Sequence, residues 1–360
     1  MVRYILIHNL SFLFTYQTTN VFCENTYILY LQYLLLFSLS KAMSNITLLF
    51  TAYGSPGPKN HVALFITLLL YVSTVLSNVV ILFVIYFDSS LHKPMYIFLF
   101  NLSINGLIGS TAVCPKIMAN LLKDNNSISL EGCLFQVLFI NVYAGCAYAI
   151  FAGMAYDRYV SICKPLQYHS IMTPLRVNVL LAVMYILPIS LLSFQVYLTS
   201  TLPLCGCNIN KLFCDNLAVV NLSCVRDAFG NVYGLFIVLA TIVLPLFLVI
   251  LSYIKILCVS LRASKNAQKK ALQTCAPHLI TFINFSIAVL FSIIYNRVSY
   301  YVPQEINILM SLDFILIPPL LHPLIYGFKT QDIRKSLYKI FRRRVFMNSD
   351  TSNQNVNRLF

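Results

Sequence analysis

The sequence predicts an all-α membrane protein, a seven-transmembrane helix bundle with a short amphipathic eighth helix. Charged residues make up only 10% of the 360 residues and hydrophobic residues 59%, whereas a soluble domain carries about 25% charged residues. Long apolar runs recur along the chain, and basic residues collect in a few connecting segments. A chain with so little charge cannot cover a water-facing surface, so much of its surface must face lipid.

The seven spans are predicted from apolar runs, because a spanning helix needs about 20 mostly apolar residues. In chain order they cover 61–87, 94–121, 133–159, 177–199, 228–257, 271–296 and 304–327. A short amphipathic helix over 330–342 follows. The runs are continuous and do not alternate with polar residues, which excludes a transmembrane barrel of strands.

The basic residues predict the orientation. The formal charge is +14, and most Lys and Arg residues fall on one side if the N-terminus lies outside the cell. Cytoplasmic loops carry this excess, so the charge indicates topology and not a nucleic-acid partner. We therefore expect a plasma-membrane protein with an extracellular segment 1–60, a bundle 61–327 and a cytoplasmic tail 328–360. The basic run of the tail is expected to attract anionic lipids of the inner leaflet.

The first 42 residues allow several interpretations. The stretch 28–39 is apolar but short, which fits the core of a signal peptide or, against the charge bias, an eighth span. Alternatively, the reading frame is over-extended and Met43 is the natural start. Asn45 then begins the sequence Asn-Ile-Thr, a candidate glycosylation site in an exposed segment.

The end of the third span carries the most informative motif. Residues 154–166 read MAYDRYVSICKPL, with Asp157 and Arg158 adjacent. Charges near a membrane are costly and are usually paired or functional, although an arginine can also simply reach toward lipid headgroups. Four further segments lie in order along the chain: KPMYIFL at 93–99, SY at 252–253, KALQTCAPHL at 270–279 and PPLLHPLIY at 318–326.

These five segments together resemble odorant (olfactory) receptors, a family of rhodopsin-like G-protein-coupled receptors, over about residues 43–342. The resemblance implies a receptor that binds small organic odorants and activates a heterotrimeric G protein. The sequence departs from the family at several positions, and two of them bear on function. His322 stands where the seventh span usually has Asn, and Gly106 stands where the second span usually has a sodium-binding Asp.

Cysteines at the outer end of the bundle suggest a disulfide framework. Cys133 begins the third span, and the loop at about 200–227 contains Cys205, Cys207, Cys214 and Cys224. The residues alone leave the connectivity open, and some thiols could be unpaired. The family resemblance implies the pairs Cys133–Cys214 and Cys205–Cys224, with Cys207 left free.

The resemblance also implies which residues line the ligand cavity. On the third span these are Ile140, Asn141, Ala144 and Gly145, at about one-turn spacing. The other spans contribute Val238, Thr241, Ser286 and Tyr295. Receptors for amines have an Asp at the position of Ile140, so a cationic amine ligand is not expected. Ala144 and Gly145 could instead only allow close helix packing.

The G-protein site implied by the resemblance lies at the cytoplasmic end. Arg158, flanked by Asp157 and Tyr159, would form the floor of a cleft that opens when the sixth span swings outward. The other residues assigned to this site are Tyr253, Lys269, Lys270, His322, Pro323 and Tyr326. His278, in contrast, is interpreted as an interfacial residue near the cytoplasmic face.

Other classes of function find little support. The sequence contains no Gly-rich phosphate loop, His-Glu-x-x-His motif or paired carboxylates, so we expect neither an enzyme nor a cofactor or metal site. A transporter usually has inverted repeats and several charges inside the membrane; here Asp313 stands out beside Asp157 and Arg158. A transporter or channel remains an alternative, as does a rhodopsin-like receptor for a non-odorant ligand.

Overall fold

The computed structural model describes residues 46–53, 57–123, 126–298, 304–340 and 342. Within these ranges the side chains of residues 270, 294–298 and 304–312 are left undescribed. The predicted segment 1–42 and the sequon residue Asn45 lie outside the described residues.

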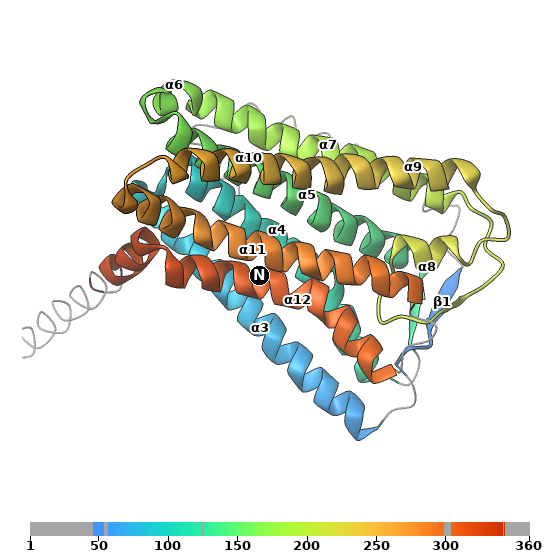
Figure 1. Ribbon diagram of the computed structural model, residues 1–360. Coiled ribbons are helices and arrows are strands. Elements are labelled where there is room, and N and C mark those ends of the chain that lie inside the picture. Colours follow the sequence, from blue (N-terminus) through green and yellow to red (C-terminus); the bar gives the residue numbers. More distant parts are fainter. Residues whose placement is uncertain (1–45, 54–56, 124–125, 299–303, 341, 343–360) are drawn as a thin grey trace, which may run out of the picture.

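Long helices dominate the described part of the chain (Figure 1). They are α3 (Pro58–Phe87), α4 (Pro94–Leu121), α5 (Leu130–Cys163), α7 (Pro174–Ser200), α9 (Ala228–Val238), α10 (Leu244–Leu261), α11 (Lys265–Val298) and α12 (Gln304–Lys329). A π-helical turn, Leu239–Val243, joins α9 to α10, so these two form one span. Within the described residues, six spans are long and apolar enough to cross a bilayer, and α12 lies beside α3 and α11. The predicted seven-helix fold is confirmed.

Shorter elements connect the spans. They are the 3₁₀ turns Ser89–Leu91 and Pro165–Gln167 and the helices α6 (Tyr168–Ile171) and α8 (Asn216–Val220). Residues 331–340 are helical after α12, where the amphipathic eighth helix was predicted.

Local sequence explains where several helices begin. Pro58, Pro94 and Pro174 occupy the first turns of α3, α4 and α7, where the missing N–H of proline costs nothing. The side chain of Ser129 accepts a hydrogen bond from the Gly132 N–H at the start of α5. Such caps satisfy the unpaired N–H groups of a first helical turn.

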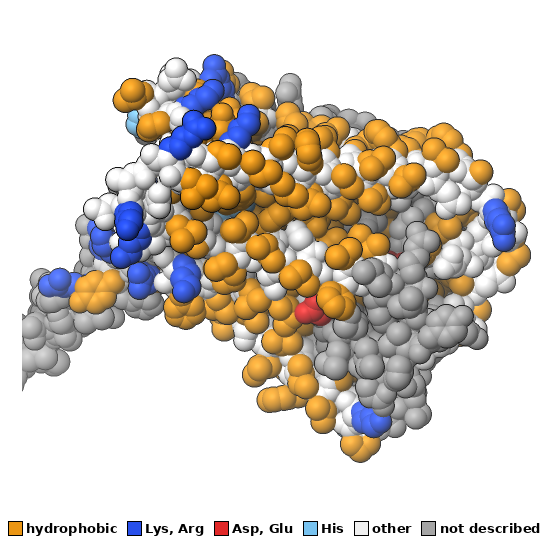
Figure 2. Space-filling view, in the orientation of Figure 1, with side chains coloured by type: hydrophobic (Ala, Val, Ile, Leu, Met, Phe, Trp, Pro, Cys, Tyr) orange, Lys and Arg blue, Asp and Glu red, His pale blue; other side chains and the backbone are white. Residues whose placement is uncertain are grey.

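The helix α5 forms the centre of the bundle. Its most apolar stretch is 61% buried, whereas those of α7 and of the α9–α10 span are 22% buried. Figure 2 shows the consequence: hydrophobic side chains cover the middle of the visible face, and Lys and Arg side chains gather mainly at one end. Apolar flanks with basic residues at one end match a protein that spans a bilayer.

A small sheet covers the opposite end of the bundle and was not predicted. Strand β1 (Thr47–Phe50) pairs antiparallel with β2 (Ser127–Ser129) and parallel with β3 (Asn208–Ile209). The hydroxyl of Tyr53 also donates to the carbonyl oxygen of Leu212 at 2.5 Å. The segment before the first span is therefore fixed to the loops that precede α5 and follow α7. Strands of two to four residues carry too few alternations to be recognised by periodicity.

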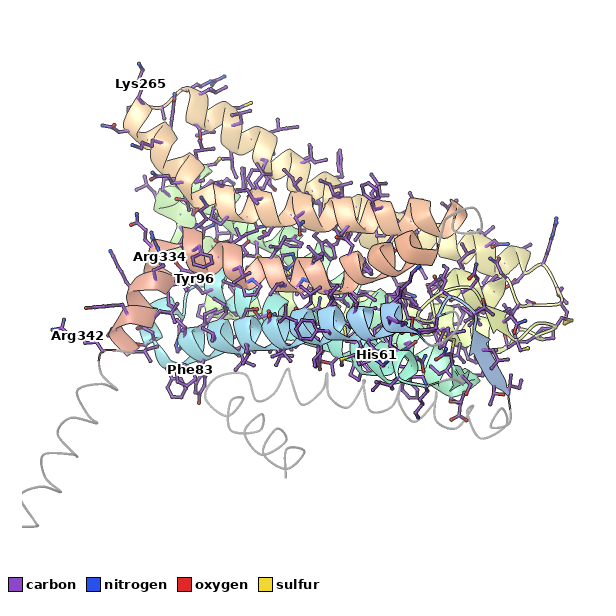
Figure 3. All side chains as sticks on the ribbon, turned by 90° about the horizontal axis from the view of Figure 1, so that it is seen from below. His61, Phe83, Tyr96, Lys265, Arg334 and Arg342 are labelled. Carbon is purple, nitrogen blue, oxygen red and sulfur yellow. A yellow bond between two sulfur atoms is a disulfide. The ribbon has the colours of Figure 1, made fainter. Side chains whose placement is uncertain are left out.

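Contacts with the first turn of α4 and with the loop between α3 and α4 hold the helix at residues 331–340. The hydroxyl of Tyr96 donates to Asp332 at 2.9 Å, and Lys339 lies 3.5 Å from the buried carboxylate of Asp88. Figure 3 shows Tyr96 beside Arg334 at the end where Lys265 and Arg342 also lie, with His61 nearer the other end.

Candidate functional site

A buried ion pair lies near the C-terminal end of α5. Asp157 is fully buried, and its Oδ2 accepts hydrogen bonds from Arg158, with the Nε contact at 3.0 Å. Its Oδ1 accepts a bond of 2.7 Å from the hydroxyl of Tyr168 on α6. Burial, and next the adjacent carboxylate, raises the pKa of Tyr168, so this hydroxyl stays a donor. Arg158 is therefore held against its own neighbour and not directed into an open cleft.

Tyr168 was missed by the sequence analysis. It lies 11 residues after Asp157, in a short loop without helical periodicity. The Pro165–Gln167 turn and α6 bring it back under α5. Only a prediction of that turn could have indicated the contact.

A histidine connects three spans near this ion pair. Nδ1 of His278 on α11 lies 2.5 Å from the hydroxyl of Tyr253 on α10. Its Nε2 lies 3.1 Å from the carbonyl oxygen of Phe151 on α5, so Nε2 carries the proton and Nδ1 accepts. The interfacial interpretation of His278 was wrong, because the side chain is fully buried. Whether a histidine near a helix end is buried or interfacial depends on about one turn of helix, which the sequence does not resolve.

The seventh span contributes Tyr326 and His322. The hydroxyl of Tyr326 accepts a bond of 3.3 Å from Thr281. The ring of His322 packs edge-on against Phe151, with ring centroids 5.4 Å apart, and its buried Nε2 has no hydrogen-bond partner among the described residues. Pro323 beside it is buried. In this arrangement neither Tyr253 nor Tyr326 bonds to Arg158.

The position of Gly106, where the family usually has an Asp, is closely packed. A Cβ at Gly106 would lie 3.2 Å from Cβ of Pro319 and 3.9 Å from Oδ1 of Asn78. The amide of Asn78 donates to the carbonyl oxygens of Pro319, at 2.9 Å, and of Thr74, at 2.8 Å. Pro319 thus occupies the space that an aspartate side chain at position 106 would need. The bond from Asn78 to Pro319 also joins α3 directly to α12.

The end of the bundle near Arg158 carries aromatic and basic side chains at its rim. The ammonium of Lys255 lies 5.6 Å from the centre of the Tyr159 ring, a cation–π distance that links α5 to α10. Lys269 is exposed at the start of α11. The side chain of Lys270 lies outside the described residues.

The expected ligand residues do not all face the bundle interior. Ile140 and Thr241 are buried, and Asn141 and Ala144 are half-buried. Val238, however, is 39% exposed on the outer surface of α9, so the structure does not bring it to the interior. The side chain of Tyr295 is not among those described.

Gly145 lies at a helix contact. A Cβ there would lie 3.2 Å from Leu192 and 3.3 Å from Pro188, both on α7, and 3.6 Å from Thr241. This is the close-packing alternative that the sequence left open. The missing side chain lets α7 approach α5.

Polar atoms that the sequence did not single out lie in the outer half of the bundle. The hydroxyl of Tyr143 and Oδ1 of Asn284 are buried without hydrogen-bond partners in the described part of the chain. The hydroxyl of Ser286, which the resemblance had implied, lies within hydrogen-bond reach of Tyr148. The Tyr143 ring packs against Phe314 at 5.6 Å, and a Cβ at Gly109 would lie 2.5 Å from this ring. Groups of this kind orient a ligand in an otherwise apolar site.

Two disulfides fix the loop that covers this end. Cys133 bonds to Cys214 and Cys205 to Cys224, the two pairs that the resemblance implied, and Cys207 is free and exposed. Oε1 of Gln136 also accepts a bond of 3.1 Å from the Cys214 N–H. The loop is therefore joined to the first turns of α5 by a disulfide and by a hydrogen bond.

Comparisons with known proteins point to one family. A family model described as "Olfactory receptor" matches residues 67–344. The chain is 35% identical over 310 residues to Olfactory receptor 52K2 of Homo sapiens, which covers 84% of this chain and 98% of that protein. It is also 35% identical over 306 residues to Olfactory receptor 1 of Rattus norvegicus, covering 82% and 95% of the two chains.

Proposed function

The chain belongs to the olfactory receptor family, and on this premise we propose that it binds small organic odorants within the helix bundle and activates a heterotrimeric G protein. The observation that carries the proposal is the match of the olfactory receptor model to residues 67–344, which reach from within α3 to beyond the end of α12. It is a multi-pass membrane protein and not an enzyme.

The N-terminus is proposed to lie outside the cell. The strand β1 pairs with the loops at the end of the bundle that carries both disulfides, and disulfides persist in an oxidising environment. The basic residues around α6, the α10–α11 turn and residues 331–340 lie at the other end, as expected for the cytoplasmic side.

The odorant site is proposed to lie between α5, the α9–α10 span and α11. Ile140, Asn141, Thr241 and Ser286 support this placement, together with the Tyr143 hydroxyl. Their environment is apolar and aromatic, with a few unpaired polar atoms, which suits small organic molecules. A cationic amine does not fit, because no carboxylate accompanies Ile140 on this part of α5.

Activation is proposed to separate contacts that the present arrangement contains. An odorant shifts the equilibrium only if it binds the open arrangement better than the closed one. The G protein then raises the affinity for odorant by the same factor by which odorant raises the affinity for the G protein. Opening would free Arg158 from Asp157 and move α11 away from α5, which breaks the His278–Phe151 bond. Arg158, Tyr159, Lys269 and Lys270 would then face the G protein.

The test is odorant-evoked nucleotide exchange by full-length receptor in lipid nanodiscs with purified G protein. A panel of odorants should contain at least one that accelerates exchange, and Arg158→Ala should abolish this response while labelled odorant still binds. Arg226→Ala, an exposed arginine at the opposite end, is the matched control. Solute flux or ion current in proteoliposomes without G protein would instead favour a transporter or channel and would contradict the proposal.

A further inference from the structure

A groove on the side of the bundle has no role in the proposed function. It lies between the outer halves of α4 and α5, beneath β1 and β2, and has a volume of about 510 Å³, within the range typical of small-molecule sites. The residues that line it are Thr47, Ala112, Lys116, Ser127, Ile128, Ser129, Gly132, Phe135, Gln136 and Phe139.

Lys116 is the positively charged residue among those that line this groove. The ammonium of Lys116 donates to the carbonyl oxygen of Ser127 at 2.7 Å, and two of its three N–H bonds remain for other acceptors. No carboxylate of the described residues lies within 4.0 Å of it, since their ion pairs join other residues. Lys123, seven residues further along, adds positive charge at the outer end of α4.

Two other polar side chains of the groove, those of Gln136 and Ser129, already form hydrogen bonds. Gln136 donates to the carbonyl oxygen of Ala112 at 3.4 Å and accepts from the Cys214 N–H. The hydroxyl of Ser129 accepts from the Gly132 N–H at 3.2 Å. The ammonium of Lys116 is therefore the group that most needs an anionic partner, because a cation inside a membrane is costly when unpaired.

The groove is polar at its outer end and apolar further in. Lys116 lies five residues before the end of α4 at Leu121, or roughly 8 Å along the helix axis. Ala112 lies one turn deeper on α4. On the antiparallel helix α5, Phe135 and Phe139 continue in the same direction, and Phe139 is 39% exposed at the lipid-facing surface. This gradient matches an amphiphile of the outer leaflet, with its head group at Lys116 and its tail toward the bilayer centre.

We propose that this groove binds a long-chain fatty acid from the outer leaflet. The carboxylate would accept hydrogen bonds from Lys116, and the alkyl chain would lie along Ala112, Phe135 and Phe139. Anionic phospholipids concentrate in the cytoplasmic leaflet, so a fatty acid is the anionic amphiphile that fits an outer-leaflet site. Gln136 lines the groove and also holds the Cys214 N–H, so the occupant contacts a side chain that fixes the extracellular loop.

The experiment uses the full-length receptor in nanodiscs of phosphatidylcholine and a long-chain fatty acid that carries a diazirine in its chain. Crosslinks should be saturable and should map to peptides containing Ala112 and residues 135–139. The unlabelled acid should compete at least tenfold better than the alcohol of equal chain length, because a hydrogen bond to a charged group is worth more than a neutral one. Neither odorant nor G protein is present, so this result is independent of the proposed receptor activity.

Variants separate the binding role of Lys116 from a structural role. Lys116→Gln should weaken binding at least tenfold, Lys116→Arg should retain most of it, and the matched control Lys123→Gln should change it less than about threefold. If Lys116→Gln does not fold, the Lys116→Arg variant and the acid–alcohol comparison on the unaltered receptor still decide. Unsaturable crosslinks, equal competition by the alcohol, unchanged binding by Lys116→Gln, or displacement of the acid by an anionic phospholipid would each overturn the proposal.

Discussion

The hydroxyl of Tyr253 and Nδ1 of His278 lie 2.5 Å apart, and this contact fastens α10 to α11. Through Nε2 the same imidazole is bonded to the backbone of α5, so one buried side chain joins three spans. Motion of α11 away from α5 must break the Phe151 contact. His278 therefore stabilises the closed arrangement specifically.

We predict that His278→Phe raises nucleotide exchange in the absence of odorant. The variant keeps an aromatic ring but loses both hydrogen bonds, each worth about 1 kcal/mol, so the closed-to-open ratio should fall by roughly fivefold to thirtyfold. The measurement is basal exchange by receptor in nanodiscs, normalised to the amount of folded receptor. His61→Phe, at an exposed position near the other end, is the control and should leave basal exchange unchanged. A lower or unaltered basal rate for His278→Phe would show that these bonds do not favour the closed arrangement.

A graded pair of substitutions tests how Asp157 restrains Arg158. Asp157→Asn removes the charge that holds Arg158, and we expect basal exchange to rise by about tenfold to a hundredfold, since hydrogen bonds to charged groups contribute roughly 1.5–3 kcal/mol. Tyr168→Phe leaves the ion pair intact and removes only the hydroxyl contact to Oδ1 of Asp157, so the rise should be smaller than that for Asp157→Asn. Equal effects of the two variants, or a decrease for Asp157→Asn, would contradict this order. Basal exchange and total binding of labelled odorant are measured on the same preparations.

The packing of Gly106 against Pro319 predicts that sodium has no effect on this receptor. Odorant affinity should be the same in sodium chloride and in choline chloride of equal ionic strength. Gly106→Asp places a carboxylate at the position used by related receptors, but its Cβ meets Pro319 at 3.2 Å. Overpacking of this kind costs about 1–3 kcal/mol, so the variant should unfold at a lower temperature and gain no sodium dependence. An odorant affinity that depends on sodium in the unaltered receptor would contradict the prediction.

Most of the bundle could be predicted from the sequence because its strongest determinant is local. Each span is an apolar run longer than the bilayer is thick, so its position along the chain can be predicted without knowledge of packing. The π-helical turn at Leu239–Val243 could not be seen this way. It precedes Pro245, which has no N–H to donate, and the sequence gives no sign that the bond pattern shifts to a wider turn.

Side-chain direction limits what the sequence reveals about the site. Ile140 and Thr241 were expected in the interior and are buried, but Val238, three residues before Thr241, faces outward, because the adjoining π-helical turn changes which residues share a face. The hydrogen bond between Tyr168 and Asp157 and the unpaired hydroxyl of Tyr143 depend on three-dimensional neighbours. No periodicity encodes such contacts, so they become visible only when the helices are placed.

The carboxylate of Asp88 gives the attachment of the eighth helix a dependence on pH. Hydrogen bonds from Ser336 and from Ser90, with the Lys339 ammonium nearby, hold the pKa of Asp88 at about 2, below its ordinary 3.8. A carboxyl group whose pKa is depressed on folding stabilises the folded state fully above its unfolded pKa, and this contribution is lost as the pH falls through the folded pKa.

We therefore predict that Asp88→Asn speeds hydrogen exchange of residues 331–340 at pH about 7. The difference from the unaltered receptor should shrink as the pH is lowered from about 4 toward about 2. Ser336→Ala should act in the same direction with a smaller effect, because it removes one of several contacts. A difference that stays constant down to pH about 2 would mean that the Asp88 charge does not hold the helix.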